Sequence, residues 1–189
     1  MDFENDIDQC LSILRDGGLI LYPTDTVWGI GCDATNAEAV DKVYQLKQRS
    51  DEKAMIVLVA DERDVLQYVA SPDLRVFDYL QDATKPTTVV YDGAIGLADN
   101  LIGRDGSIAI RICEESFCKT LLKRFRKPLV STSANISGEP TAKIFIDIEE
   151  KIKSGVDYIV QYRQDDETIA APSAVIKWNN DGTFVVLRP

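Results

Sequence analysis

The chain has 189 residues, 45% hydrophobic and 28% charged, which is typical of one globular domain and not of a disordered segment. Its formal net charge of −10 argues against binding nucleic acid over its whole surface, because such binding exchanges counterions for many basic side chains. It contains no histidine, which excludes Ser-His-Asp triads, Cys-His pairs and histidine metal sites.

The N-terminal sequence MDFENDID is acidic where a signal peptide would be basic, and no apolar run approaches the ~20 residues of a membrane span. We therefore expect a cytoplasmic protein without membrane contact. The four cysteines form no C-x-x-C pair and lie in apolar contexts, so we expect reduced thiols in the core and neither a disulfide nor a zinc site.

Apolar periodicity and turn residues predict that helices and strands alternate along the first half of the chain. Gly17 can end the first helix in the left-handed conformation, and residues 35–38 (TNAE) resemble a capping box that starts the second. The expected elements are a helix over 5–16, a strand over 19–22, a helix over 37–47, a strand over 54–59, helices from 61 and from 71, and a strand over 87–91.

The second half continues this alternation after a glycine-rich stretch, 93–106, which we expect to be a loop. The expected elements are a strand over 107–112, a helix over 114–125, a strand over 129–131, a helix over 146–153, an extended segment over 158–160 and a hairpin of 174–178 with 183–187. This order predicts an α/β fold: residues 1–189 form a single domain with an open, twisted mixed sheet flanked by helices.

A polar elbow, Thr24-Asp25-Thr26, follows the first predicted strand directly after Pro23. Ligands bind at the carboxyl ends of strands in open α/β sheets, so we expect other segments to bring polar groups to this elbow. Asp25 could equally be only the acceptor of an Asx turn, and Trp28 is more often a core residue than a stacking platform.

Three basic residues, Lys47, Arg49 and Lys53, lie near the end of the second predicted helix. They could simply favour the helix dipole, or they could direct positive charge at an anion over the sheet. A second polar segment, 131–138, is rich in hydroxyl and amide groups. Its side chains could form hydrogen bonds to the backbone groups of a turn, or they could form a binding site rich in hydrogen-bond donors for a phosphate or an adenylate.

Arg111 lies inside an alternating apolar strand, where an unpaired guanidinium would be costly. It must therefore face a cavity, a carboxylate partner or solvent, and we hypothesise that it meets an anionic ligand. Lys119, Lys123 and Lys127 line one outer face of the helix expected over 114–125, and we expect that face to be solvated.

Four motifs, in this order and spacing, resemble the YrdC-like threonylcarbamoyl-AMP synthases in their short, single-domain form. They are YPTDTVWGIG from Tyr22, LKQR from Leu46, SIAIR from Ser107 and PLVSTSANISG from Pro128. The resemblance implies an open α/β sheet with an electropositive, concave ligand cavity. It also implies the formation of threonylcarbamoyl-AMP and pyrophosphate from L-threonine, bicarbonate or carbon dioxide, and ATP with Mg²⁺. A separate transferase complex then modifies certain tRNAs with the threonylcarbamoyl group (t6A).

The resemblance also implies site residues. The catalytic group would be Lys47, Arg49, Ser133 and Asn135. ATP would be bound by these four residues together with Lys53 and Ser131. Threonine would be bound by Tyr22, Thr24, Thr26, Arg111 and Ser173. No protein ligand of the metal is assigned. Attack of a carboxylate on the α-phosphate needs positioning and cations but no general base, so a chain without histidine can carry out this step.

Two other functions stay open at this point. One is a divergent relative without synthase activity that binds RNA through the same concave face, although the net charge of −10 allows at most a weak, focal contact with RNA. The other is a related enzyme that adenylates a different carbamoyl donor, as the similar domain of hydrogenase maturation proteins does.

Overall fold

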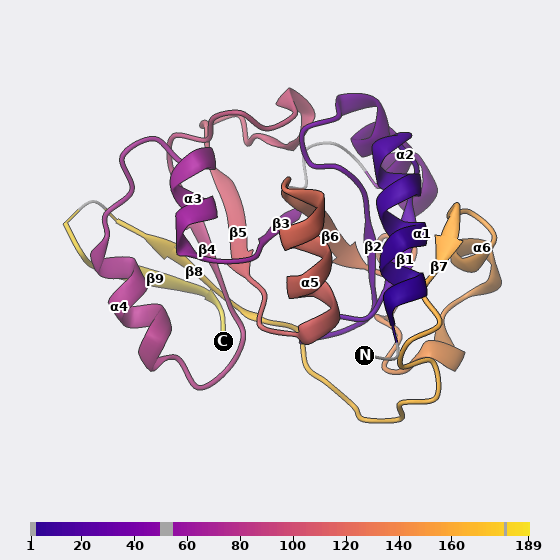
Figure 1. The fold of residues 1–189 in the computed structure, drawn as a ribbon. Coiled ribbons are helices and arrows are strands. Elements are labelled where there is room, and N and C mark those ends of the chain that lie inside the picture. The colour runs from indigo at the N-terminus through magenta and orange to yellow at the C-terminus, as the bar shows by residue number, and fades with distance from the viewer. Residues whose placement is uncertain (1–2, 50–54, 180) are drawn as a thin grey trace.

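The computed structural model describes residues 3–49, 55–179 and 181–189. Its strands form one nine-stranded sheet in the order β7-β1-β2-β6-β3-β5-β4-β8-β9 (Figure 1). They are β1 (Ile20–Tyr22), β2 (Gly29–Gly31), β3 (Ile56–Val59), β4 (Thr87–Tyr91), β5 (Ile108–Ile112), β6 (Leu129–Ser133), β7 (Tyr158–Ile159), β8 (Ala174–Trp178) and β9 (Phe184–Arg188).

The sheet is mixed, as the sequence predicts. The pairs β1 with β7, β3 with β5 and β4 with β8 are parallel, whereas the other neighbours run antiparallel. The helices are α1 (Glu4–Arg15), α2 (Ala37–Lys47), α3 (Glu62–Tyr68), α4 (Arg75–Asp82), α5 (Ser116–Phe125) and α6 (Glu150–Lys153), with 3-10 turns at Asp99–Leu101 and Phe145–Asp147. In Figure 1, α1, α3 and α5 lie in front of the sheet, where each contacts it.

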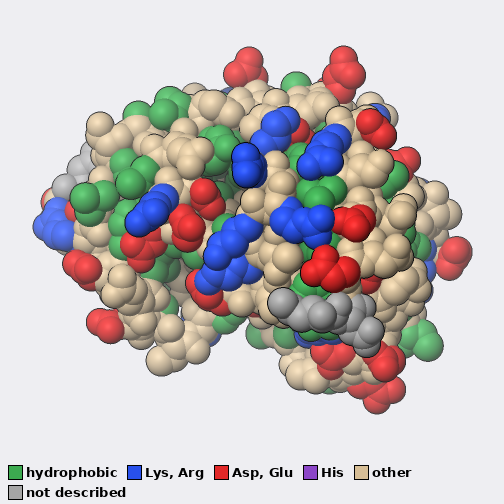
Figure 2. Space-filling view, in the orientation of Figure 1, with side chains coloured by type: hydrophobic (Ala, Val, Ile, Leu, Met, Phe, Trp, Pro, Cys, Tyr) green, Lys and Arg blue, Asp and Glu red, His purple; other side chains and the backbone are tan. Residues whose placement is uncertain are grey.

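The face of the molecule that these helices cover carries charges of both signs. In the same orientation, Figure 2 shows Lys and Arg side chains near its centre, with Asp and Glu among them and around them. The ion pairs on this side include Lys119 with Glu114 at 2.6 Å and Arg124 with Asp8 at 2.7 Å. On this face, positive and negative side chains therefore neutralise one another locally.

Two local predictions are wrong. Helix α2 starts after Asn36, whose side chain accepts bonds from the backbone N–H groups of Glu38 and Ala39. The expected capping box at Thr35 does not form, because Asp33 accepts the bonds of both the Thr35 hydroxyl and the Thr35 N–H, at 2.6 and 2.8 Å. The helix expected over 146–153 is divided into the 3-10 turn Phe145–Asp147 and α6, because the buried residue between them, Ile148, has an extended backbone.

Alternation along the central strands separates the two faces of the sheet. Ile108 and Ile110 of β5 are almost completely buried, whereas Ala109 and Arg111 between and after them line a cavity. Successive side chains of a strand point to opposite faces, so one face of β5 joins the apolar core and the other faces the cavity. The sheet is therefore both the wall of the core and the floor of a site.

Gly31 lets β2 pack directly against the Tyr22 ring. A Cβ added at Gly31 would lie 2.6 Å from Cε1 of Tyr22 and 2.8 Å from the carbonyl oxygen of Val130. Since that carbonyl belongs to β6 and also accepts the Tyr22 hydroxyl, at 3.2 Å, neither neighbour can move away freely. We expect Gly31→Ala to lower the free energy of unfolding in urea by about 1–3 kcal/mol.

Gly29→Ala is the matched control for this prediction. Its added Cβ would meet only the Ser131 hydroxyl, at 3.2 Å, with the next atoms at 3.6 Å. We therefore expect a clearly smaller loss of stability. Equal losses for the two variants would show that the contact with Tyr22 does not limit the packing of β2.

Candidate functional site

The elbow after β1 is held by its own hydrogen bonds. Thr24 Oγ1 accepts the backbone N–H of Thr26, at 3.0 Å, and donates to the carbonyl oxygen of Val27, at 2.8 Å. The two threonine hydroxyls lie 3.0 Å apart. Because the Thr24 proton is already committed to Val27, the Thr26 hydroxyl must donate in this pair. Thr26 therefore presents oxygen lone pairs to its surroundings and acts as an acceptor.

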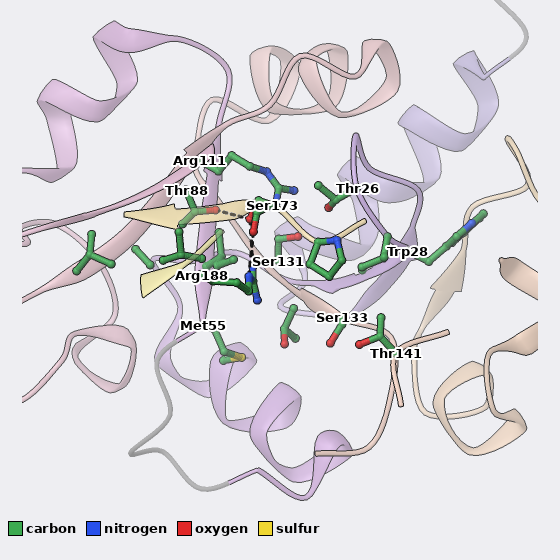
Figure 3. A pocket seen from close by; sticks show the side chains of 18 of the residues that line it. Thr26, Trp28, Met55, Thr88, Arg111, Ser131, Ser133, Thr141, Ser173 and Arg188 are labelled. Atoms are coloured by element: carbon green, nitrogen blue, oxygen red, sulfur yellow. Dashed lines mark hydrogen bonds between the residues drawn. The ribbon is translucent and has the colours of Figure 1, made fainter. Parts of the chain in front are cut away.

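A cavity of about 350 Å³ opens beside Thr26 on the face of the sheet (Figure 3). Lining residues alternate along β5, with Ala109 and Arg111, and along β4, with Thr88 and Val90, whereas β6 contributes residues 131–133. We had expected a site at the carboxyl ends of strands. The cavity lies across the middle of the sheet instead, because alternation places short and polar side chains on this one face.

The lining is basic and rich in hydroxyl groups. Three arginines, Arg49, Arg111 and Arg188, line the cavity, and its described lining includes no acidic side chain. Burial, and then the charge of Arg111, lowers the pKa of Arg188. Burial also lowers the pKa of Arg49. Guanidinium groups that are partly dehydrated and near one another favour an anionic ligand between them.

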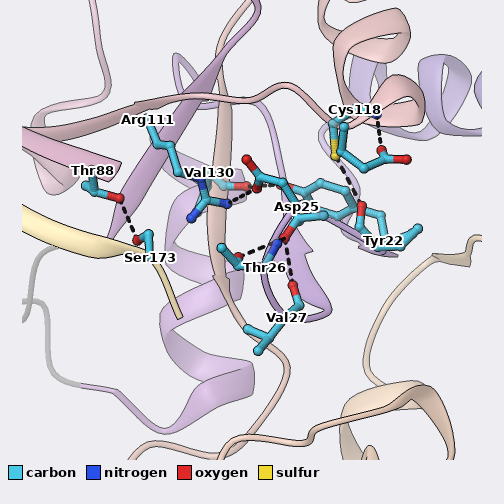
Figure 4. Close-up of polar contacts among 12 residues, drawn as sticks. Tyr22, Asp25, Thr26, Val27, Thr88, Arg111, Cys118, Val130 and Ser173 are labelled. Carbon is cyan, nitrogen blue, oxygen red and sulfur yellow. Dashed lines mark hydrogen bonds and ion pairs between the residues drawn. The ribbon is translucent and has the colours of Figure 1, made fainter. Parts of the chain in front are cut away.

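Arg111 is anchored by Asp25 at the elbow (Figure 4). Its Nη2 lies 3.0 Å from Asp25 Oδ1, and the two side chains are 3% and 14% exposed. The pair has ion-pair distance without hydrogen-bond alignment, and Arg111 Nε has no hydrogen-bond partner among the described residues. Of the surroundings expected for Arg111, the structure provides two, a cavity and a carboxylate partner.

Ser173 joins the cavity from the segment before β8. Its hydroxyl lies 2.8 Å from the Thr88 hydroxyl, and its carbonyl oxygen accepts Arg188 Nε at 2.9 Å. Thr88 and Arg188 were missed by the sequence reasoning. Arg188 carries the same signal as Arg111, a charged residue in an apolar strand, and that signal could have identified it.

Lys47 does not line the cavity, although the sequence places it in the catalytic group. Its Nζ donates to the carbonyl oxygen of Ser133 and, at 2.6 Å, to that of Asn135. The side chain is 1% exposed. Burial, and then the charge of Arg49, lowers the pKa of Lys47 to about 8. Lys47 thus ties the end of α2 to the loop that follows β6.

The other predicted site residues divide into two groups. Thr26, Arg49, Arg111, Ser131, Ser133 and Ser173 all lie in the cavity wall. The Tyr22 hydroxyl is buried against Val130, and Asn135 Nδ2 donates to the carbonyl oxygens of Ile136 and Glu139 in its own loop. The Thr24 hydroxyl is bonded within the elbow, to the carbonyl oxygen of Val27. Lys53 lies outside the described residues. Trp28, expected in the core, is nearly buried and also lines the cavity.

The described ranges contain neither a cluster of metal-binding side chains nor a membrane-spanning helix. In residues 3–49, 55–179 and 181–189, no three His, Cys, Asp or Glu side chains gather closely enough to hold a metal ion. Within the same ranges, no helix combines the length and the apolar character needed to cross a membrane.

Comparison with known proteins identifies the family. The Sua5/YciO/YrdC family model, described as telomere recombination, matches residues 12–189. The chain belongs to the Sua5/YciO/YrdC family. Curated relatives named threonylcarbamoyl-AMP synthase include those of Stenotrophomonas maltophilia, 35% identical over 82% of this chain and 84% of the relative, and Idiomarina loihiensis, 33% identical over 88% and 90%.

Solved structures of the family have the same fold. The structure of P. abyssi Sua5 complexed with L-threonine gives a TM-score of 0.86 at 22% identity, and the match covers 98% of this chain and 54% of that one. This chain therefore spans about half the length of that protein. E. coli YciO gives a TM-score of 0.83 at 23% identity and covers 97% and 88%. The Sua5/YciO/YrdC fold thus extends over almost the whole chain.

The buried ammonium of Lys47 predicts a specific pH dependence of stability. Its folded pKa of about 8 lies below the usual 10.5, so the unfolded chain binds more protons between these values. The contribution of Lys47 to the free energy of unfolding must therefore rise with pH across this window, by roughly 3 kcal/mol at most.

Lys47→Met removes this titration and tests the prediction. Urea unfolding of both proteins from about pH 7 to about pH 10 should show the difference, wild type minus variant, increasing with pH. A constant difference would mean that folding does not lower the pKa of Lys47.

Proposed function

We propose that this protein is an L-threonylcarbamoyladenylate synthase, a nucleotidyltransferase that makes threonylcarbamoyl-AMP and pyrophosphate from L-threonine, bicarbonate or carbon dioxide, and ATP. The observation that carries the proposal is the cavity itself, where three arginines and seven hydroxyl side chains meet with no acidic residue in the described lining. The curated relatives named threonylcarbamoyl-AMP synthase add support.

The proposed chemistry needs what this cavity offers. The amine of threonine first adds to carbon dioxide and loses a proton, which gives a carbamate. A carbamate oxygen then attacks the α-phosphorus of ATP, and the bond to pyrophosphate breaks. Both reactants of the second step are anions, so cations that hold them in line lower the barrier more than a general base would.

We assign roles by position in the cavity. Arg49 and Ser133 bind phosphate oxygens, together with Ser131. Arg111, Thr26 and Ser173 bind threonine, with Arg111 on the α-carboxylate. The lone pairs of the Thr26 hydroxyl can accept a hydrogen bond from an ammonium or hydroxyl group of the substrate. A site that selected by size alone would not distinguish threonine from an amino acid of the same size without a hydroxyl.

Lys47 and Asn135 act on the loop after β6 in this proposal. The Lys47 ammonium would have to leave two carbonyl oxygens to reach a phosphate, so its role is to hold Ser133 in place. Tyr22 and Thr24 likewise stabilise the elbow, through hydrogen bonds of their hydroxyl groups to the carbonyl oxygens of Val130 and Val27. The nucleotide substrate would be the Mg²⁺ complex of ATP, and the ion would supply charge neutralisation on the leaving pyrophosphate.

The wider context follows from the same reaction. We propose that residues 1–189 act as one domain in the cytoplasm and that a tRNA threonylcarbamoyl transferase complex consumes the product. One continuous sheet containing strands from Ile20 to Arg188 supports the single domain. Any tRNA contact of this protein itself would be weak and local.

Pyrophosphate release by the purified protein tests the function directly. With ATP, Mg²⁺ and bicarbonate present, we expect L-threonine to accelerate release and L-valine to leave it at the rate without amino acid. The reason is the polar wall of Thr26 and Ser173, whose hydroxyl groups can make further hydrogen bonds to a substrate hydroxyl that L-valine lacks. Release that ignores threonine but responds to carbamoyl phosphate would favour a different carbamoyl donor.

Arg49→Ala should reduce threonine-dependent pyrophosphate release by about 100-fold or more, because a cation near the transferred phosphorus is lost. Arg124→Ala is the control, since Arg124 is a half-exposed arginine paired with Glu4 and Asp8 on the helix-covered face. We expect the control to keep wild-type activity and both variants to fold. Comparable losses of activity in Arg49→Ala and Arg124→Ala would indicate that activity depends on the total charge of the protein and not on the position of Arg49 in the cavity.

A further inference from the structure

The ion pair between Arg111 and Asp25 joins the cavity to the elbow. Arg111 comes from the middle of the sheet, in β5, and Asp25 from the turn after β1, 86 positions earlier in the chain. The two strands are not neighbours, because β2, β6 and β3 lie between them in the sheet. The contact is therefore made by side chains across the sheet face.

Asp25 lies outside the cavity that Arg111 lines. It borders a separate cavity of about 570 Å³ formed with the start of α3, the end of α4 and the segment after β5. Figure 4 shows the Asp25 carboxylate beside the Arg111 guanidinium, and Asp25 is not among the described residues that line the first cavity. A ligand in the first cavity can meet Arg111 without displacing Asp25.

The elbow gives Asp25 a fixed position. The residues on either side, Thr24 and Thr26, are bonded to each other and to Val27, and the Thr24 carbonyl accepts Arg163 Nη1 at 3.2 Å. A carboxylate on such a turn has little freedom to follow a moving partner. Arg111, in contrast, has a long side chain whose Nε lacks a hydrogen-bond partner among the described residues.

Arg111 also experiences a second positive charge. Arg188 lines the same cavity and is close enough that Arg111 helps to lower its pKa. Repulsion between the two groups would turn Arg111 away from the cavity unless an opposite charge held it. Asp25 is the carboxylate within ion-pair distance of Arg111 in the described ranges.

We propose that Asp25 is a positioning residue, which fixes the Arg111 guanidinium at the cavity wall so that it meets the α-carboxylate of the amino-acid substrate. This inference rests on the proposed function, in which Arg111 binds threonine. Asp25 touches no substrate and acts only through Arg111. Since the α-carboxylate does not react, Asp25 supports binding equally before and during the reaction, and its loss should appear in KM.

Asp25→Asn keeps the shape of the side chain and removes its charge. We expect the KM for L-threonine to rise about tenfold, with kcat and the KM for ATP changed less than about twofold. Asp92→Asn is the matched control, because Asp92 pairs with Lys177 at 3.4 Å on the surface. The control should leave all three constants at wild-type values. An unchanged threonine KM in Asp25→Asn overturns the proposal.

A double-mutant cycle tests whether Asp25 acts through Arg111. Arg111→Met keeps the length of the side chain and removes its charge. Adding Asp25→Asn to Arg111→Met should change the threonine KM by less than about twofold, because the partner is already absent. A further tenfold rise would mean that Asp25 acts independently of Arg111, which also overturns the proposal.

A ligand-free measurement separates this inference from the proposed function. In ¹H–¹⁵N spectra, the Nε–H signal of Arg111, assigned by its absence in Arg111→Met, should be resolved in the wild type and in Asp92→Asn. It should broaden or move to the position of solvent-exposed arginines in Asp25→Asn. An unchanged signal overturns the positioning role. Absence of threonine-dependent pyrophosphate release from the wild type would instead reject the proposed function alone.

Discussion

The alternation of side chains along β4 and β5 is the constraint on which the structure depends. One set of residues, such as Ile108 and Ile110, closes the apolar core beneath the helices. The intervening set, such as Ala109 and Arg111, forms the floor of the cavity. A shift of one residue in the pairing would exchange the two sets, burying arginine in the core and exposing isoleucine. Fold and site are therefore fixed by the same register.

Positive charge is the second organising feature. The molecule is acidic overall, yet three arginines line the cavity and an almost buried lysine lies next to it. For three of these four cations, identified polar partners offset part of the cost of losing water. Lys47 binds two backbone carbonyls, Arg188 binds the Ser173 carbonyl, and Arg111 has an ion pair. These fixed partners leave the arginines directed at a space that an anion can fill.

Much of the fold and part of the site follow from the sequence. Glycines, prolines and apolar periods gave most elements to within two residues, because these signals are local. The charge of Arg111 within an apolar strand indicates a residue that faces a ligand or a partner, and the structure places Arg111 in the cavity wall. Thr88 and the cavity position of Arg188 were missed because local patterns do not say that β8 lies between β4 and β9 in the sheet. The partners of Lys47 were equally hidden, since they are backbone atoms 86 and 88 positions away.

The place of β9 has a consequence for how the site is assembled. Thr26 lies near the beginning of the chain, whereas Arg188 reaches the cavity from the last strand of the sheet, which pairs with β8. During synthesis on the ribosome, the elbow, the Arg111–Asp25 pair and the loop after β6 can all form before this arginine has emerged. The cavity then lacks one of its guanidinium groups until β9 docks. Pairing of β9 with β8 and completion of the basic cavity wall are thus the same event.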